Sequence, residues 1–175
     1  MKRILFILLM LPTICFAQKG FESSVKISYE VPLDQNQSFG ADYIAGYRLS
    51  ETFKIGLGTG AYWCSHLYEE DNKYGDYKES AMYIPIYVNG KINFTGDGVS
   101  PYFTLDLGYS LFVSFSDYAD ENKLGLFARP AFGVDFPIGE GKLFTEVGYK
   151  YQKRKWDYFE SPNYSQITIS VGYSF

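Results

Sequence analysis

Apolar and polar residues alternate along most of the chain from Phe21 onward. The clearest example is the last stretch, Tyr164 to Phe175, in which Ile167, Ile169 and Val171 each stand between polar or small residues. A period of two is typical of a β-strand with one apolar and one polar face. The alternation continues to the last residue, whereas the ends of soluble domains usually fray, so we expect this strand to be locked into a closed sheet.

Seven further segments have the same pattern, and each is close to the roughly 9–11 residues that a tilted membrane-spanning strand needs. The eight predicted strands are 21–31, 39–49, 53–64, 82–94, 102–115, 124–136, 143–153 and 164–175. Pro85 and Pro130 fall inside two of them. Because proline removes a donor from the hydrogen-bond ladder, each is a candidate β-bulge.

The connections between the predicted strands alternate in character. The second, fourth and sixth are short, and two of them, 95–100 and 137–142, contain glycines that suit tight turns. The first, third, fifth and seventh are longer and more polar, with His66 to Glu79 as the predicted third loop. Short turns at one end and long loops at the other are typical of a membrane barrel with both termini in the periplasm.

The first seventeen positions predict a secretory signal peptide. Lys2 and Arg3 precede an apolar run from Ile4 to Leu11, and small residues lead to Ala17. The run is too short for a membrane-spanning helix, which needs roughly 20 residues. We therefore expect a signal peptide over 1–17 and one outer-membrane barrel domain over 18–175.

Composition narrows the class of protein. The formal net charge of −4 becomes −6 once Lys2 and Arg3 are removed, which argues against nucleic acid as a partner. Cys64 is then the only cysteine, so the chain has no internal disulfide and no cysteine-based metal cluster. Tyrosine, with 17 residues, suits membrane interfaces. No mature segment has the length of an apolar spanning helix, so the chain would cross a membrane only as a closed barrel.

Acidic and basic residues occur in equal numbers on the polar faces of the predicted strands. Buried charges require partners, so we expect them to form an ion-pair network in the lumen. The predicted network consists of Glu22, Lys26, Glu30, Asp42, Arg48, Lys54, Lys91, Asp106, Arg129, Asp135, Glu146 and Lys150. Side chains nearly fill an eight-stranded barrel, which predicts a plugged lumen with no continuous pore. The alternative is a soluble lipocalin-like barrel, in which the same charges face water.

Aromatic residues on the apolar faces are candidates for the membrane-interface girdles. They are Tyr43, Tyr47, Trp63, Tyr109, Tyr149, Tyr151, Tyr173 and Phe175.

Three short motifs carry a resemblance to a known family. They are Ile84-Pro85-Ile86, Ser100-Pro101-Tyr102-Phe103 with the following Gly108-Tyr109, and Gly172-Tyr173-Ser174-Phe175. The mature chain resembles the small outer-membrane barrels of the OmpA/OmpX type, especially the outer membrane protein β-barrel domain (PorT-like) group common in Bacteroidetes. This resemblance implies an all-β, eight-stranded, antiparallel up-and-down transmembrane barrel in the cell outer membrane. It also implies that Phe175 is a signal for the barrel-assembly machinery, with a simple girdle aromatic as the alternative.

Signals for catalysis are sparse. His66 is the only histidine, so no multi-histidine metal site is possible within one chain. Ser65 precedes it and acidic residues follow, which leaves a route to a lipid A-modifying acyl hydrolase. Adjacent residues of a strand point to opposite faces, however. We therefore expect no enzymatic activity, no cofactor and no metal site.

The external loops are the better candidates for a working surface. Acidic residues in them could hold divalent cations that bridge lipopolysaccharide phosphates, and basic residues could contact those phosphates directly. The acidic set is Glu69, Glu70, Asp71, Asp76, Glu79 and 117–121, and the basic set is Lys150, Lys153, Arg154 and Lys155, near Trp156.

The predicted role is structural, adhesive or interaction-based, through the extracellular loops. The expected partners are outer-membrane lipid and lipopolysaccharide, the barrel-assembly machinery and an extracellular ligand. Three alternatives remain: a small channel or porin, a lipid A-modifying acyl hydrolase, and a soluble periplasmic lipocalin-like binder.

Overall fold

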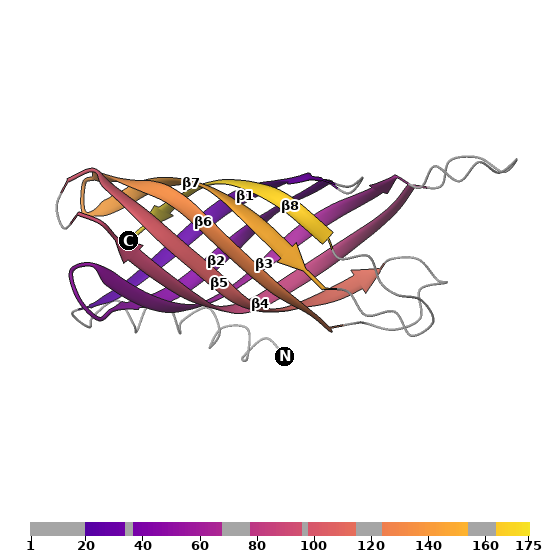
Figure 1. Cartoon of the computed structure of the whole chain (residues 1–175), viewed down its shortest axis with the longest axis horizontal. Helices are drawn as coiled ribbons and strands as arrows, with labels where there is room; N and C mark the ends of the chain where they lie inside the picture. The colour runs from indigo at the N-terminus through magenta and orange to yellow at the C-terminus, as the bar shows by residue number, and fades with distance from the viewer. Residues whose placement is uncertain (1–19, 34–36, 68–77, 96–97, 115–123, 154–163) are drawn as a thin grey trace, which may run out of the picture.

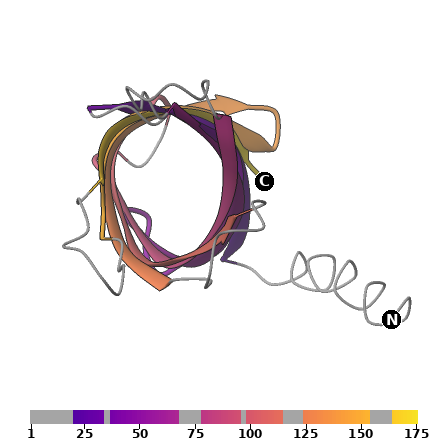
Figure 2. The same cartoon turned by 90° about the vertical axis from the view of Figure 1, so that its right-hand side faces the viewer.

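Eight antiparallel strands follow one another around a closed barrel in chain order. The structure is a computed structural model that describes residues 20–33, 37–67, 78–95, 98–114, 124–153 and 164–175. Figure 1 shows the tilted strands from the side, and Figure 2 shows the closed ring from one end. The strands are β1 (Phe21–Pro32), β2 (Gln37–Arg48), β3 (Phe53–Leu67), β4 (Lys78–Asn93), β5 (Ser100–Ser114), β6 (Leu124–Ile138), β7 (Gly141–Gln152) and β8 (Tyr164–Ser174).

The first and last strands close the barrel. β1 pairs with β8 along its length, from Ser24 opposite Ser174 to Pro32 opposite Gln166. One residue beyond, Ser23 donates its N–H to the carbonyl of Phe175 (3.0 Å) and accepts the N–H of Phe175 (2.8 Å). The sheet therefore has no edge, which confirms the predicted closure and the eight-stranded fold. In the part of the chain that the structure describes, no helix has the length and apolarity to span a membrane.

The strand limits agree with the predicted ones to within a few residues, with one larger difference. β3 continues to Leu67 and β4 begins at Lys78, with His66 opposite Glu79 in the β3–β4 pairing. The prediction of a loop from His66 to Glu79 was therefore wrong at both of its ends. The polar residues at these strand ends were interpreted as a loop. They form strands because backbone pairing between two strands does not require apolar side chains.

The turn between β6 and β7 is tighter than predicted. Pro137 pairs with Lys142 and Ile138 with Gly141, so only Gly139 and Glu140 lie between the strands. Gly139 has a φ of 63°, a left-handed conformation that glycine adopts at no steric cost.

Neither interior proline produces a bulge. The β3–β4 ladder lacks two pairs at Pro85, and the β6–β7 ladder lacks two pairs at Pro130, yet each ladder resumes in the same register. On its other neighbouring strand, β5 in both cases, each proline has a paired residue, Ser110 for Pro85 and Leu105 for Pro130. The missing N–H of each proline thus interrupts one ladder without inserting an extra residue.

The two ends of the barrel differ in their connections (Figure 1). The turn end, on the left, carries the short connections 49–52, 94–99 and 139–140, the start of β1 and the end of β8. The loop end carries 33–36, 68–77, 115–123 and 153–163. The predicted alternation of long and short connections is confirmed except at the first one. That connection, 33–36, was expected to be long but has the same length as the turn 49–52.

The barrel is inverted relative to a soluble protein. Large apolar side chains cover the outer wall, with Leu57 68% and Phe132 66% exposed, while charged side chains fill the interior. A soluble lipocalin-like barrel would have the opposite arrangement, so the structure argues against that alternative.

Inward-facing aromatic rings pack over glycines on the neighbouring strand. Tyr87 lies directly opposite Gly58, and Tyr102 lies directly opposite Gly133. A Cβ atom at either glycine would overlap the ring of its partner. Tyr62 with Gly40 and Phe144 with Gly172 repeat the arrangement. The absence of a side chain at each glycine lets a ring lean along the wall and fill the narrow lumen.

Candidate functional site

The interior of the barrel contains most of the charged residues that the sequence singled out. Ten of the twelve are at most 7% exposed: Lys26, Glu30, Asp42, Lys54, Lys91, Asp106, Arg129, Asp135, Glu146 and Lys150. The remaining two, Glu22 and Arg48, lie at the turn end, where they form an ion pair with each other. All twelve therefore face the lumen or its mouth.

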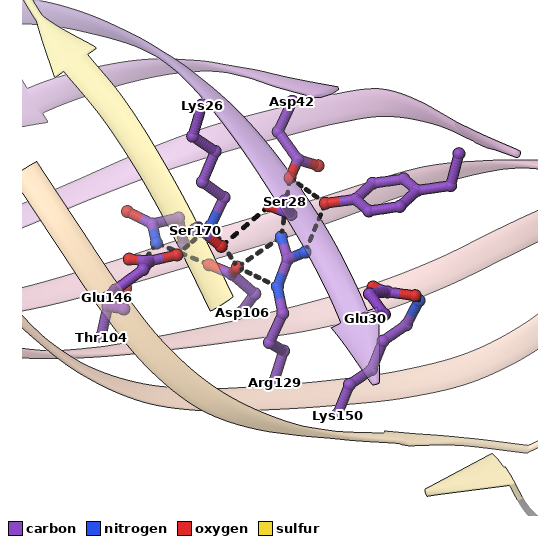
Figure 3. A network of polar contacts seen from close by, with 12 residues as sticks. Lys26, Ser28, Glu30, Asp42, Thr104, Asp106, Arg129, Glu146, Lys150 and Ser170 are labelled. Carbon is purple, nitrogen blue, oxygen red and sulfur yellow. Dashed lines mark hydrogen bonds and ion pairs between the residues drawn. The ribbon is translucent and has the colours of Figure 1, made fainter. Parts of the chain in front are cut away.

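Arg129 on β6 is the centre of the network (Figure 3). Its Nε and Nη2 atoms lie 2.9 Å and 2.8 Å from Oδ2 of Asp106, and Nη2 lies 3.3 Å from Oδ2 of Asp42. Its Nη1 donates to the hydroxyl of Tyr62 (2.8 Å), which itself donates to Asp42. One guanidinium thus joins two buried carboxylates that come from different strands.

Lys26 extends the network toward the turn end. Its Nζ lies 2.7 Å from Oε1 of Glu146 and 3.4 Å from Oδ2 of Asp106. Tyr102 donates its hydroxyl to Glu146 (3.1 Å), and Asn89 donates to Oδ1 of Asp106 (2.6 Å). Each of these carboxylates therefore has both a cation and a neutral donor, as buried charges require.

A second cluster lies closer to the loop end. Nζ of Lys150 is 3.0 Å from Oε1 of Glu30, and Tyr83 donates its hydroxyl to Oε2 of the same carboxylate (2.6 Å). From its place near the end of a predicted strand, Lys150 was also expected at the surface, in contact with lipopolysaccharide phosphates. That prediction was wrong, because Lys150 is 1% exposed and its ammonium is directed at Glu30.

Two further groups of ion pairs occupy the turn end. Lys91 lies 2.7 Å from Asp135 and 3.7 Å from the ring centroid of Tyr102, while Asn93 donates to Oδ2 of Asp135 (2.8 Å). At the mouth, Lys54 pairs with Glu22 at 2.8 Å.

Several of these contacts cross the full width of the barrel. Lys26 on β1 reaches Asp106 on β5, and Arg129 on β6 reaches Asp42 on β2. In a ring of eight strands in chain order, each pair joins opposite walls. Beside Lys26 and Glu146 is a cavity of about 20 Å³, which has room for about one water molecule.

The neutral members of the network were not predicted from the sequence. Tyr62, Tyr83, Tyr102 and Asn89 face the lumen but were not among the site residues predicted from the sequence. The available signal was the position of tyrosines on a face otherwise made of charged, hydroxyl and glycine residues. Some of the tyrosines therefore form the packed lumen, although the high tyrosine content was expected to reflect the membrane interface alone.

The predicted girdle residues lie on the outer wall. Six are exposed, namely Tyr47, Trp63, Tyr109, Tyr149, Tyr173 and Phe175, while Tyr43 and Tyr151 are half-buried. The hydroxyl of Tyr43 shares a 2.9 Å hydrogen bond with Ser23. A role of Phe175 in assembly stays a prediction.

Most of the loop residues that were predicted to bind cations or phosphates lie outside the described residues. This applies to Glu69, Glu70, Asp71, Asp76, residues 117–121, Arg154, Lys155 and Trp156, and also to the signal peptide at 1–17. Within the described ranges, no group of three or more histidine, cysteine, aspartate or glutamate residues is arranged to hold a metal ion.

Comparison with known families identifies the barrel. Residues 17–175 match the family described as the outer membrane protein beta-barrel domain. The chain belongs to this family. The protein is therefore an outer-membrane β-barrel, and its apolar outer wall faces lipid. The narrower PorT-like assignment stays a prediction. No curated protein matches the sequence.

Solved structures with the same fold share little sequence with the chain. Neisserial surface protein A (NspA) has a TM-score of 0.60 at 15% identity, covering 88% of this chain and 94% of its own. The N-terminal barrel domain of Pseudomonas aeruginosa OprF has a TM-score of 0.52 at 14% identity, covering 90% and 100%. The outer membrane enzyme PagL has a TM-score of 0.50 at 14% identity, covering 87% and 98%. At these identities the likeness shows the fold alone.

Proposed function

We propose that the protein is a closed, non-conducting outer-membrane scaffold that presents its external loops for adhesion or interaction. The observation that carries this proposal is the set of ion pairs across the lumen, centred on Arg129 with Asp42 and Asp106. A scaffold of this kind needs a rigid wall and does not need a path through the interior.

Energetics support a closed lumen. An open path would have to separate the buried pairs, and breaking one by removing a partner costs about 3–5 kcal/mol in proteins. It would also have to move the rings of Tyr62, Tyr83 and Tyr102, which are each at most 2% exposed. The small-channel alternative is therefore disfavoured on both electrostatic and steric grounds.

The loops supply the interaction surface. The longest connections, 68–77, 115–123 and 153–163, all leave the loop end of the barrel. They contain acidic clusters and the basic pair Arg154 and Lys155, which suit divalent cations and phosphates respectively. Lipopolysaccharide or an extracellular ligand is the partner that this chemistry favours.

Conductance of the purified protein in planar lipid bilayers tests the closed lumen. We expect no discrete current steps from the wild type. Current steps in the wild type that become larger in a Tyr62→Ala/Tyr83→Ala variant would show that ions pass through the lumen. That result would overturn the proposal.

Binding of lipopolysaccharide to protein in detergent micelles, with and without Mg²⁺, tests the loops. A Glu69→Gln/Glu70→Gln/Asp71→Asn variant should lose the Mg²⁺-dependent part of the binding. The turn-end variant Glu51→Gln is the matched control, because Glu51 is an exposed acidic residue at the other end of the barrel. Equal loss in both variants would contradict a role for the loop.

A lipid A-modifying acyl hydrolase is the second candidate. The register places His66 directly opposite Glu79 across the β3–β4 pairing, so a histidine and a carboxylate, two of the three residue types of a hydrolytic triad, meet on paired strands. The test is the mass spectrum of lipid A from cells that express the protein. A loss of one acyl chain that depends on His66, and is absent in His66→Ala, would establish this activity.

A further inference from the structure

A cavity of about 290 Å³ at the turn end is lined by both charged and apolar residues. Glu22, Arg48 and Lys142 line it from the mouth of the lumen, Glu140 lines it from the β6–β7 turn, and Phe21 and Phe175 line it from the rim. A second, more polar cavity of about 250 Å³ shares Glu22, Arg48 and Lys142 with the first. Arg48 and Lys142 thus line both cavities, at the turn end of the barrel.

The cations of this mouth have capacity for a further anion. Lys142 forms no ion pair with any residue that the structure describes, and it is half-buried. Arg48 contributes only its Nη2 to Glu22, and its side chain is 47% exposed. By contrast, the other cation of the mouth, Lys54, is buried and engaged by Glu22 and Ser24. A guanidinium and an ammonium at one cavity are suited to a phosphate group.

An apolar groove of about 500 Å³ lies on the outer wall farther along β7 and β8, two of the strands that line the charged cavity. It is lined mainly by Phe132 and Val134 of β6, Val147 of β7, and Ile169 and Val171 of β8. Leu143 and Tyr173 are exposed, directly opposite each other on β7 and β8, and they lie between the charged cavity and the groove along those strands. Exposed apolar residues therefore connect the charged cavity to the groove in the lipid-facing wall.

We propose that this surface binds one phospholipid from the membrane leaflet at the turn end. Its phosphate lies between Arg48 and Lys142, and one acyl chain passes over Leu143 and Tyr173 into the groove. Glu140, which is exposed beside the two cations, faces the ammonium of an ethanolamine headgroup. The preferred ligand is therefore an ethanolamine phospholipid. This inference depends on the outer-membrane location and is independent of the role of the loops.

Native mass spectrometry of the full-length mature protein released from detergent tests the headgroup site. With added phosphatidylethanolamine, we expect one tightly retained lipid per barrel, and about a tenfold weaker retention in Arg48→Gln/Lys142→Gln because two charge-assisted contacts are lost. Lys78→Gln, at a cation of the loop end where β4 begins, is the matched control and should retain lipid as the wild type does. Wild-type retention by the double variant, or an equal loss in Lys78→Gln, would overturn the proposal.

A second pair of variants tests the acyl groove. Val147→Trp should fill the groove and reduce lipid retention, whereas Val88→Trp, at another exposed valine on the far wall, should not. Glycerophosphoethanolamine and inorganic phosphate at millimolar concentration should fail to displace the lipid. If either displaces it fully, the site takes a free phosphate and the lipid assignment is wrong. Heat-modifiable migration on a gel confirms that each variant is folded.

Discussion

The rings of Tyr62 and Tyr83 stack inside the barrel with their centroids 4.7 Å apart and their planes inclined by 10°. They come from directly paired positions of β3 and β4, and their hydroxyls serve different ion clusters. Tyr62 bonds to Arg129 and Asp42, while Tyr83 bonds to Glu30 and Lys150. The stack thus joins the central cluster to the one near the loop end into one packed interior.

Loss of the Tyr83 hydroxyl should destabilise the barrel. Tyr83→Phe leaves Oε2 of Glu30 without its neutral donor and Lys150 without one acceptor, so we expect a loss of about 1–3 kcal/mol in the free energy of unfolding. Urea unfolding in lipid vesicles, followed by tryptophan fluorescence, measures it. Tyr109→Phe removes an outward hydroxyl and should change the free energy far less. Equal effects of the two variants would show that the Glu30 cluster contributes nothing specific.

Removal of Arg129 should be more costly. Arg129→Met leaves the carboxylates of Asp42 and Asp106 short of a cation in the lumen, and we expect a loss of about 3–5 kcal/mol. The same unfolding assay applies, together with the temperature at which heat-modifiable migration is lost. Arg48→Met removes a half-exposed partner and should cost no more than about 1 kcal/mol. A small effect of Arg129→Met would mean that the central network is not needed for stability.

The contact of Tyr87 with Gly58 predicts a steric effect. A methyl group at Gly58 would overlap the Tyr87 ring, so Gly58→Ala should destabilise the barrel by about 1–3 kcal/mol. Gly90→Ala is the control, because a Cβ there meets only the Leu105 carbonyl oxygen at 4.0 Å. Combining Gly58→Ala with Tyr87→Leu should recover part of the loss. No difference between Gly58→Ala and Gly90→Ala would contradict the ring-over-glycine packing.

The depth of Trp63 tests the girdle assignment. Trp156→Phe leaves Trp63 as the only tryptophan, and brominated lipids then report its depth by fluorescence quenching. Bromines near the headgroup should quench Trp63 more strongly than bromines near the chain ends, because interfacial aromatics sit at headgroup level. Adding Trp63→Phe and Thr59→Trp moves the outward-facing probe next to Gly60, the middle residue of β3, and should reverse the order. Stronger quenching of Trp63 by the deep bromines would place it outside the girdle.

The period-two alternation determined the strands, their number and the face that each residue occupies. It succeeded because the two faces of every strand meet media of opposite polarity, lipid outside and a charged lumen inside. It misplaced the ends of β3 and β4, where Ser65, His66, Lys78 and Glu79 carry no apolar signal. The resemblance at the three short motifs led to the family that the match over 17–175 shows.

The sequence could show that lumen charges balance, but only the tertiary structure decided which acid meets which base. Arg129 and Asp42 are far apart in the chain and lie on opposite walls, so their contact depends on the closure and register of all eight strands together. The same holds for the alignment of the Tyr62 and Tyr83 rings, and for the joining of Arg48 with Lys142 at one cavity. The alternation along a strand determines which face of the sheet a residue occupies, because that depends on backbone geometry alone. The partner across a lumen is set by the shape of the closed ring.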